Sequence, residues 1–226
     1  MNPPVITPGI YALRPDFAAL SILVTGARNG PSDPSGAEQL RLACEAQETE
    51  WAEAHLDAWR GAYRAFGAKP QRTPCSVEAL RKRSQRDGAL PPVNAVVDLY
   101  NAISLRYALP IGGEDADAYA GTPRLVVAQG GEAFDTAQSG EPKIEIVDSG
   151  EVIWRDDHGA TCRRWNWRQG VRTRITEDST AMWFILERLD PMPVSALMRA
   201  GDDLIAGLKR LSPSLQASSL LLQRPD

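Results

Sequence analysis

Helix-like and strand-like patterns are segregated along this sequence, and that segregation limits the fold more than any other feature. Three segments with helical spacing or helix boundary signals lie between residues 35 and 107, whereas short runs of strand-forming residues follow residue 121. Runs of helices followed by runs of strands indicate an α+β domain, because a parallel α/β sheet needs the two to alternate. Residues 5–25 add two or three short strands, and no internal repeat is visible. We therefore expect an α+β fold, with helices mainly in the first half and strands mainly in the second.

The expected helices begin and end at residues with a physical reason to stand there. Ser35 and Glu38 form a capping box for a helix over residues 35–66, in which each side chain satisfies an unpaired amide. The second helix begins at Pro74, which needs no amide donor in a first turn, and ends at Gly88. In the third helix, apolar residues recur with helical spacing: Val93, Val96, Val97, Tyr100, Ile103 and Tyr107.

The second half of the sequence contains most of the expected strands and one more helix. The strands are expected at residues 124–128, 144–147, 151–155, 161–165 and 181–186. The last helix is amphipathic and carries Leu197, Leu204, Leu208 and Leu211. We expect a single domain over residues 1–211, followed by a loosely ordered C-terminal tail over residues 212–226.

Cysteine and histidine are too few and too scattered for several common kinds of site. Cys44, Cys75 and Cys162 lie far apart, which argues against a disulfide framework or a Cys-x-x-Cys knuckle. His55 and His158 have no second ligand at zinc-site spacing, so no metal is expected. No window approaches about 18 uninterrupted apolar residues, and no signal peptide precedes the first expected strand. A cytoplasmic protein with reduced thiols and no membrane segment is therefore expected.

Arginine dominates the basic residues of this chain. The formal net charge is −4, and the 25 basic residues include only four lysines, at 69, 82, 143 and 209, which leaves 21 arginines. A base-composition bias of the genome explains such an excess, and so does bidentate binding of phosphate or carboxylate by guanidinium groups. Composition leaves both explanations open.

Five of these arginines are interleaved with two tryptophans in one short segment: Arg163, Arg164, Trp165, Trp167, Arg168, Arg172 and Arg174. If the segment is a strand, Arg164, Asn166 and Arg168 face one side and the two tryptophans face the other. The arginine face is then either the polar wall of a binding pocket or a solvated outer surface. The tryptophans are expected in the core.

Residues 91–190 resemble a known family. The helix PVNAVVDLYNAISLR at 92–106 and the segment LPIGGEDAD at 109–117 are similar to the B3/B4 domain of the β subunit of phenylalanyl-tRNA synthetase. Residues 131–134 and 180–187 fit a later turn and strand of that domain, and RWNWRQ at 164–169 is similar to its freestanding members. Together with the helix that carries Trp59, Tyr63 and Phe66, the likeness runs from about residue 59 to residue 190.

The resemblance implies a layered β/β/α domain. Within the synthetase, this domain has a pocket that hydrolyses mischarged tyrosyl-tRNA without a metal or an organic cofactor. A freestanding copy is therefore expected to bind tRNA or aminoacyl-tRNA and to act in trans as an aminoacyl-tRNA deacylase. The alternative is a module that binds tRNA or an amino acid and has lost the editing chemistry. A third possibility is a small-molecule site unrelated to RNA, which the acidic net charge supports.

Carrying the family's pocket onto this sequence gives uneven matches. The family's pocket histidine falls on Gly112, and this substitution favours the non-catalytic alternative. The pocket glutamate corresponds most nearly to Glu187, with Leu186 as its rival. The backbone amides at Gly112 and Gly113 are candidates for stabilising an oxyanion. The residues expected to shape the amino-acid pocket are Asn101, Arg164, Asn166, Arg168 and Gln169.

Several polar residues near this pocket have two interpretations. Asn101, in the middle of an apolar helix, either reaches the pocket or bonds a neighbouring backbone group. Glu114, Asp115 and Asp117 either orient water or an α-amino group, or cap a turn.

A basic helix face provides candidate contacts to the tRNA backbone. Its residues are Arg81, Lys82, Arg83 and Arg86, which could bind phosphates without reading base sequence. Short charge runs are also common on solvated helix surfaces, so both interpretations stand.

Overall fold

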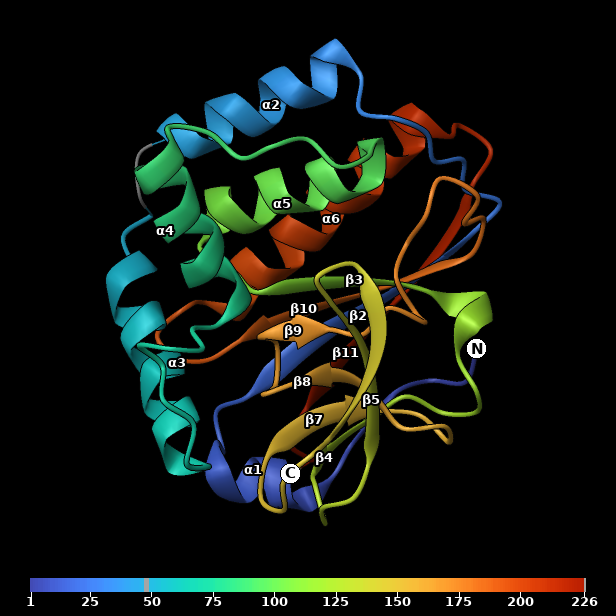
Figure 1. The fold of residues 1–226 in the computed structure, drawn as a ribbon. Coiled ribbons are helices and arrows are strands. Elements are labelled where there is room, and N and C mark those ends of the chain that lie inside the picture. Colours follow the sequence, from blue (N-terminus) through green and yellow to red (C-terminus); the bar gives the residue numbers. More distant parts are fainter. Residues whose placement is uncertain (47–48, 226) are drawn as a thin grey trace.

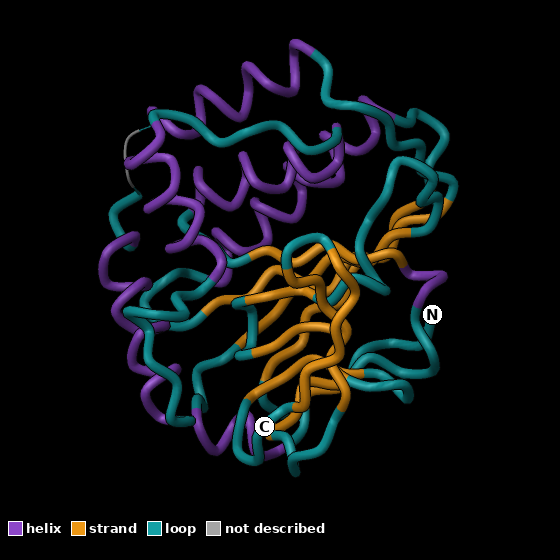
Figure 2. Tube along the Cα trace, viewed as in Figure 1, coloured by secondary structure: helices purple, strands orange, loops and turns teal. Residues whose placement is uncertain are grey.

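The computed structural model describes residues 1–46 and 49–225, which form three layers (Figure 1). Helices cover one face of a four-stranded sheet, and a larger sheet packs against the opposite face. Figure 2 shows most of the helical segments gathered on one side of the strands. The expected α+β class is confirmed, and the expected last helix is followed by one further strand.

The four-stranded sheet forms the middle layer and is antiparallel throughout. Its strand order is β11 (Gln216–Gln223), β2 (Ala18–Thr25), β10 (Met182–Arg188) and β3 (Ile111–Asp115). Because side chains alternate along a strand, the two faces of β10 enter different cores. Phe184 and Leu186 pack toward the helices, whereas Trp183 and Ile185 pack toward the larger sheet. Glu187 follows in the same alternation and faces the larger sheet.

The larger sheet is mixed, with both parallel and antiparallel pairs. Its strand order is β1 (Val5–Ile6), β4 (Arg124–Val127), β7 (Val152–Arg155), β8 (Ala160–Arg163), β5 (Ala133–Gln138) and β6 (Glu141–Ile146), with β9 (Arg168–Gln169) paired to β8. The β1–β4 and β5–β8 pairs are parallel, and the remaining pairs are antiparallel.

The helices mostly pack on the far side of the four-stranded sheet. They are α1 (Pro8–Leu13), α2 (Pro34–Glu45), α3 (Ala52–Ala65), α4 (Ser76–Asp87), α5 (Ala95–Tyr107) and α6 (Val194–Leu211), with a 3₁₀ turn η1 (Ala116–Ala118). The expected apolar stripe of α6 is buried at Leu197, Leu204 and Leu208. In α3, Trp59 and Tyr63 point into the core that lies between the four-stranded sheet and the larger sheet.

Two expectations for the N-terminal third need correction. Residues 8–13 form a helix, because Pro8 occupies a first-turn position where no amide donor is needed. The helix expected over residues 35–66 is two helices, and residues 47 and 48 of that range lie outside the described part of the chain. Asp33, instead of Ser35, is the N-cap of α2 and accepts a hydrogen bond from the Gly36 amide.

The tail expected to be loosely ordered contains a strand. Residues 216–223 form β11, which pairs along its whole length with β2. The segment lacks β-branched residues, so its own sequence does not indicate a strand. The free edge of β2 supplies the backbone hydrogen-bonding partners that fix it. Among the described helices, none is both long and apolar enough to cross a membrane.

Candidate functional site

Five of the residues expected at a pocket line one small cavity between the two sheets. They are Gly112, Asn166, Arg168, Gln169 and Glu187, and the cavity volume is about 90 Å³. We call this cavity the Trp165 pocket, because the buried indole of Trp165 also lines it. The pocket brings together β3, β10 and the hairpin formed by β8 and β9.

A tight turn at the tip of this hairpin places the pocket residues. Residues 164–167 form the turn, with φ of 48° at Arg164 and 66° at Trp165. Such left-handed conformations cost energy for residues other than glycine and persist only where their surroundings hold them. The expected alternation of Arg164, Asn166 and Arg168 against the two tryptophans is therefore wrong. Both Trp165 and Asn166 are buried in this turn.

A buried ion pair holds the start of the turn. The Arg163 guanidinium donates to both carboxylate oxygens of Glu151, at 2.9 and 2.7 Å. The Arg164 amide donates to the same carboxylate at 3.1 Å. Bidentate pairs of this kind are geometrically specific, so Arg163 has a structural role.

Glu187 is the centre of a buried hydrogen-bond network. Its Oε1 accepts from the Trp154 indole at 3.0 Å, and its Oε2 accepts from Asn166 Nδ2 at 2.8 Å. The Tyr63 hydroxyl donates to Asn166 Oδ1 at 2.9 Å. Burial raises the pKa of Glu187 to about 8, although the hydrogen bonds that it accepts from Asn166 and Trp154 act in the opposite direction. Glu187 is therefore mostly protonated at neutral pH.

The same network accommodates both protonation states of Glu187. When the carboxyl is ionised, it accepts from Asn166 as described. When it is protonated, reversal of the Asn166 amide lets the carboxyl donate to Oδ1, while Nδ2 donates to the Tyr63 hydroxyl. The orientation of an asparagine amide is assigned from such networks, and both orientations satisfy the three side chains here.

Two buried donors that line this pocket, the Ser76 hydroxyl and the Trp165 indole N–H, have no partner within hydrogen-bonding distance among the described residues. The Trp165 ring is packed by Phe17, Trp59 and Phe66, with ring centroids 5.2, 5.4 and 6.3 Å away. A buried donor without a partner costs roughly 1–3 kcal/mol. A ligand with an acceptor atom in the pocket would remove that cost.

Glu114 places a second carboxyl in the pocket wall. It is buried, and the Tyr119 hydroxyl donates to its Oε2. Burial raises its pKa, and the hydrogen bond from Tyr119 opposes that shift. From the sequence, two roles were open for Glu114, which follows the glycine pair: orienting water or an α-amino group, or capping a turn. Trp154 was not expected at the site, because it belongs to a strand that carries no motif.

Comparisons with known proteins identify the family of this chain. A family model described as the B3/4 domain matches residues 58–200. The chain belongs to the B3/4 domain family. The match begins where the likeness seen in the sequence begins and extends ten residues beyond it.

One solved structure shares the fold of this B3/4 protein. It is an N-terminal fragment of the phenylalanyl-tRNA synthetase β subunit from Pyrococcus horikoshii, with a TM-score of 0.51 and 12% sequence identity. The similarity covers 100% of this chain and 55% of the other, so this chain spans about half the length of that fragment. The comparison with curated proteins gives no significant match.

The glycine pair of this B3/4 protein is held within β3. Glu187 N donates to Pro110 O, and every second pair along an antiparallel ladder exchanges hydrogen bonds. Gly112, opposite Ile185, therefore uses its amide in the sheet. The Gly113 backbone faces the other edge, where its carbonyl accepts from Gln169 Nε2 at 2.7 Å. Of the two expected oxyanion donors, only the Gly113 amide is directed away from β10.

Arg168 lines the Trp165 pocket, but its guanidinium bonds residues outside that pocket. Arg168 Nη2 donates to the Thr136 hydroxyl at 2.6 Å, and its Nη1 lies 3.7 Å from Glu145. Arg164 lines a separate groove. Asn101 lies in α5 and does not line the pocket.

The expected basic face on α4 is largely paired with acids. Its four cations all lie within 4 Å of a carboxylate: Arg81 of Glu53, Lys82 of Glu78, and both Arg83 and Arg86 of Asp87. These pairs are partly exposed and individually weak, but they offset the positive charge of the face.

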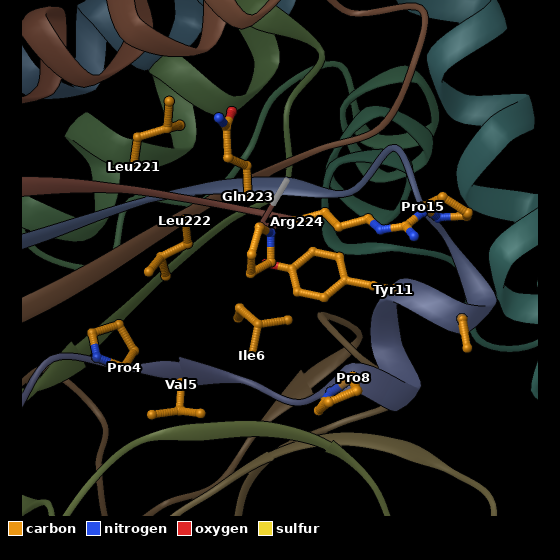
Figure 3. Close-up of a pocket in the computed structure, with 12 residues that line it drawn as sticks. Pro4, Val5, Ile6, Pro8, Tyr11, Pro15, Leu221, Leu222, Gln223 and Arg224 are labelled. Atoms are coloured by element: carbon orange, nitrogen blue, oxygen red, sulfur yellow. The ribbon is translucent and has the colours of Figure 1, made fainter.

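A larger cavity lies elsewhere and carries little chemistry. It has a volume of about 900 Å³ and lies between the N-terminal segment and β11 (Figure 3). Its walls are mainly apolar, with Tyr11, Gln223 and Arg224 as the polar side chains (Figure 3). The smaller Trp165 pocket, with two buried carboxyls and an unpartnered indole, is therefore the better candidate site. Among the described residues, no group of three or more His, Cys, Asp or Glu side chains is arranged to hold a metal ion.

Proposed function

We propose that this B3/4 protein binds aminoacyl-tRNA and hydrolyses the ester bond of a mischarged one, with the amino-acid side chain in the Trp165 pocket. The observation that carries the proposal is the convergence of Gly112, Asn166, Gln169 and Glu187, from three separate segments of the chain, on one pocket. All four were selected from the sequence by their resemblance to an editing domain. The fold shared with a synthetase fragment supports the same context.

The pocket favours a small, uncharged side chain. A cavity needs about 10–15 Å³ to hold one water, so 90 Å³ accommodates only a few non-hydrogen atoms. The walls combine Trp154, Trp165 and Ile185 with two carboxyls whose pKa values are raised by burial. A hydroxyl-bearing side chain suits this lining, because it accepts from the Trp165 indole and donates to a carboxyl oxygen.

The proposed reaction is attack by water on the aminoacyl carbonyl carbon. The bond between that carbon and the ribose oxygen breaks, the free amino acid forms, and the proton from water ends on the ribose oxygen. The Gly113 amide is the remaining candidate donor to the oxyanion. Glu187 or Glu114 would transfer the proton, since a carboxyl whose pKa is raised toward neutrality suits that role.

Deacylation of a panel of mischarged tRNAs by the purified protein tests this proposal. We expect hydrolysis above the buffer rate for at least one small amino acid, and a strong loss in Asn166→Ala. Arg168→Ala is the matched control within the same hairpin, because its guanidinium bonds Thr136, which does not line the pocket. Rates equal to buffer across the panel would remove the enzymatic proposal.

The second candidate is a binding module without catalysis, and one specific observation favours it. Both oxygens of Glu187 already accept hydrogen bonds, and the amide of Gly112 is used in the sheet. Filter binding of tRNA over a salt series separates the two candidates. A steep salt dependence without hydrolysis supports the binding module.

A further inference from the structure

A second groove lies beside the Trp165 pocket and has not been assigned a role above. Its volume is about 430 Å³, and it lies between the loop joining α3 to α4 and the turn at residues 164–167. Its walls include Phe66, Lys69, Arg72, Asp148, Glu151 and Arg164. We call it the Lys69 groove.

The Lys69 groove has an excess of positive charge. Its buried acid, Glu151, is neutralised by the bidentate pair with Arg163, and Arg164 lies 3.7 Å from the same carboxylate. Lys69 and Arg72 are exposed, and within the described residues neither has an acidic side chain within 4 Å. Apart from Glu151, Asp148 is the only acidic residue among the described residues that line the groove. This contrasts with α4, where every cation of the expected face has an acidic neighbour.

Two ring contacts connect the groove to the pocket. The Phe66 ring in the groove lies 6.3 Å, centroid to centroid, from the Trp165 ring in the pocket wall. The Arg164 guanidinium lies 4.5 Å above the ring of Trp167, which also lines the pocket. A chain bound in the groove would therefore lie beside the turn at residues 164–167, whose residues line the Trp165 pocket.

We propose that the Lys69 groove binds the phosphodiester backbone of the single-stranded 3′ end of tRNA. The proposal rests on the proposed function, because it takes the aminoacyl group in the Trp165 pocket as the end of that strand. Lys69, Arg72 and Arg164 neutralise phosphates, and the half-buried Phe66 provides a face on which a base stacks. Basic grooves with interleaved aromatic rings are the usual sites for single-stranded nucleic acid.

Binding of unacylated tRNA, measured by filter retention from about 25 to 250 mM salt, tests the groove. The Lys69→Ala/Arg72→Ala variant is compared with Arg199→Ala/Lys209→Ala, which removes one lysine and one arginine from the exposed side of α6. We expect the groove variant to lose roughly tenfold or more in affinity at low salt. Its plot of log affinity against log salt should flatten by about 1.4, because each single-strand phosphate contact contributes about 0.7. The α6 variant should bind like wild type.

A third variant, Arg83→Ala/Arg86→Ala, compares the groove with the α4 face. A larger loss in this variant than in the groove variant overturns the proposal, and so does equal loss in the groove and α6 variants. If wild type fails to bind tRNA at the lowest salt, both the groove and the proposed function fail. If wild type binds and hydrolyses while the groove variant is unaffected, only the groove proposal fails.

Discussion

The substitution Glu187→Gln should remove a specific pH dependence of stability. The introduced glutamine imitates the protonated glutamate, because its amide can donate to a reversed Asn166 while its oxygen still accepts from Trp154. The variant should therefore fold with the same network. What it loses is a carboxyl that titrates with a pKa of about 8 in the folded protein instead of its ordinary 4.5.

The sign and size of the effect follow from proton linkage. Between pH 4.5 and 8 the folded protein binds a proton at Glu187 that the unfolded chain has released, so rising pH favours unfolding. The full shift of about 3.5 pH units corresponds to about 5 kcal/mol at 1.36 kcal/mol per unit. Between pH 5.5 and 7.5, wild type should lose about 2.5 kcal/mol through this group alone.

The measurement is urea-induced unfolding of both proteins at pH 5.5, 6.5, 7.5 and 8.5. Because other groups titrate equally in the two proteins, the difference between their unfolding free energies isolates Glu187. The glutamine variant should gain on wild type by about 2.5 kcal/mol between pH 5.5 and 7.5. A difference that stays constant over this range would mean that Glu187 is ionised in the folded protein at neutral pH, and the reasoning from its burial would fail.

Three further perturbations test the packing around the site. Gly113→Ala should cost about 1–3 kcal/mol in urea unfolding, because its Cβ would lie 2.9 Å from a ring carbon of Tyr100. His55→Ala should cost about 2–4 kcal/mol of unfolding free energy, because its Nε2 accepts from two buried N–H groups. The variant should also lack the loss of stability that wild type shows on acidification from pH 6.5 toward 4, because burial lowers the pKa of His55. If that variant still loses as much stability as wild type between pH 6.5 and 4, the lowered pKa of about 4 that burial gives His55 is contradicted. Ending the chain at residue 214 removes β11 and should lower Tm by roughly 6–10 °C, as about 2–3 kcal/mol of partly buried leucine packing is lost. Calorimetry showing an unchanged Tm would mean that β11 contributes nothing to the fold.

The sequence predicted which residues meet at the site better than it predicted how they are presented. Asn166 and Glu187 were selected by resemblance to a family, and they bond each other directly. The turn that presents Asn166 was missed, because its left-handed residues are Arg164 and Trp165 and carry no glycine or asparagine signal. Their conformation is imposed by the buried pair at Glu151, a contact that no local pattern records.

The outward direction of Arg168 was missed for a similar reason. A count of arginines predicts positive charge, but not which acceptor each guanidinium reaches first. Here the Thr136 hydroxyl and the Glu145 carboxylate, both from strands far away in the sequence, hold Arg168. Lys69 and Arg72, which belong to no basic run in the sequence, have no carboxylate within 4 Å among the described residues, because few acidic side chains lie near their loop.

The position of β2 has a consequence for how the chain folds during synthesis. β2 is made among the first 25 residues, yet both of its neighbours, β10 and β11, come from the end of the chain. Its two apolar faces and both of its edges therefore remain uncovered while about 150 further residues are made. Folding of the central sheet is a late event, completed only when the last strand has left the ribosome. Until then the nascent chain exposes a strand that other chains can pair with, so its soluble yield should depend on protection by chaperones.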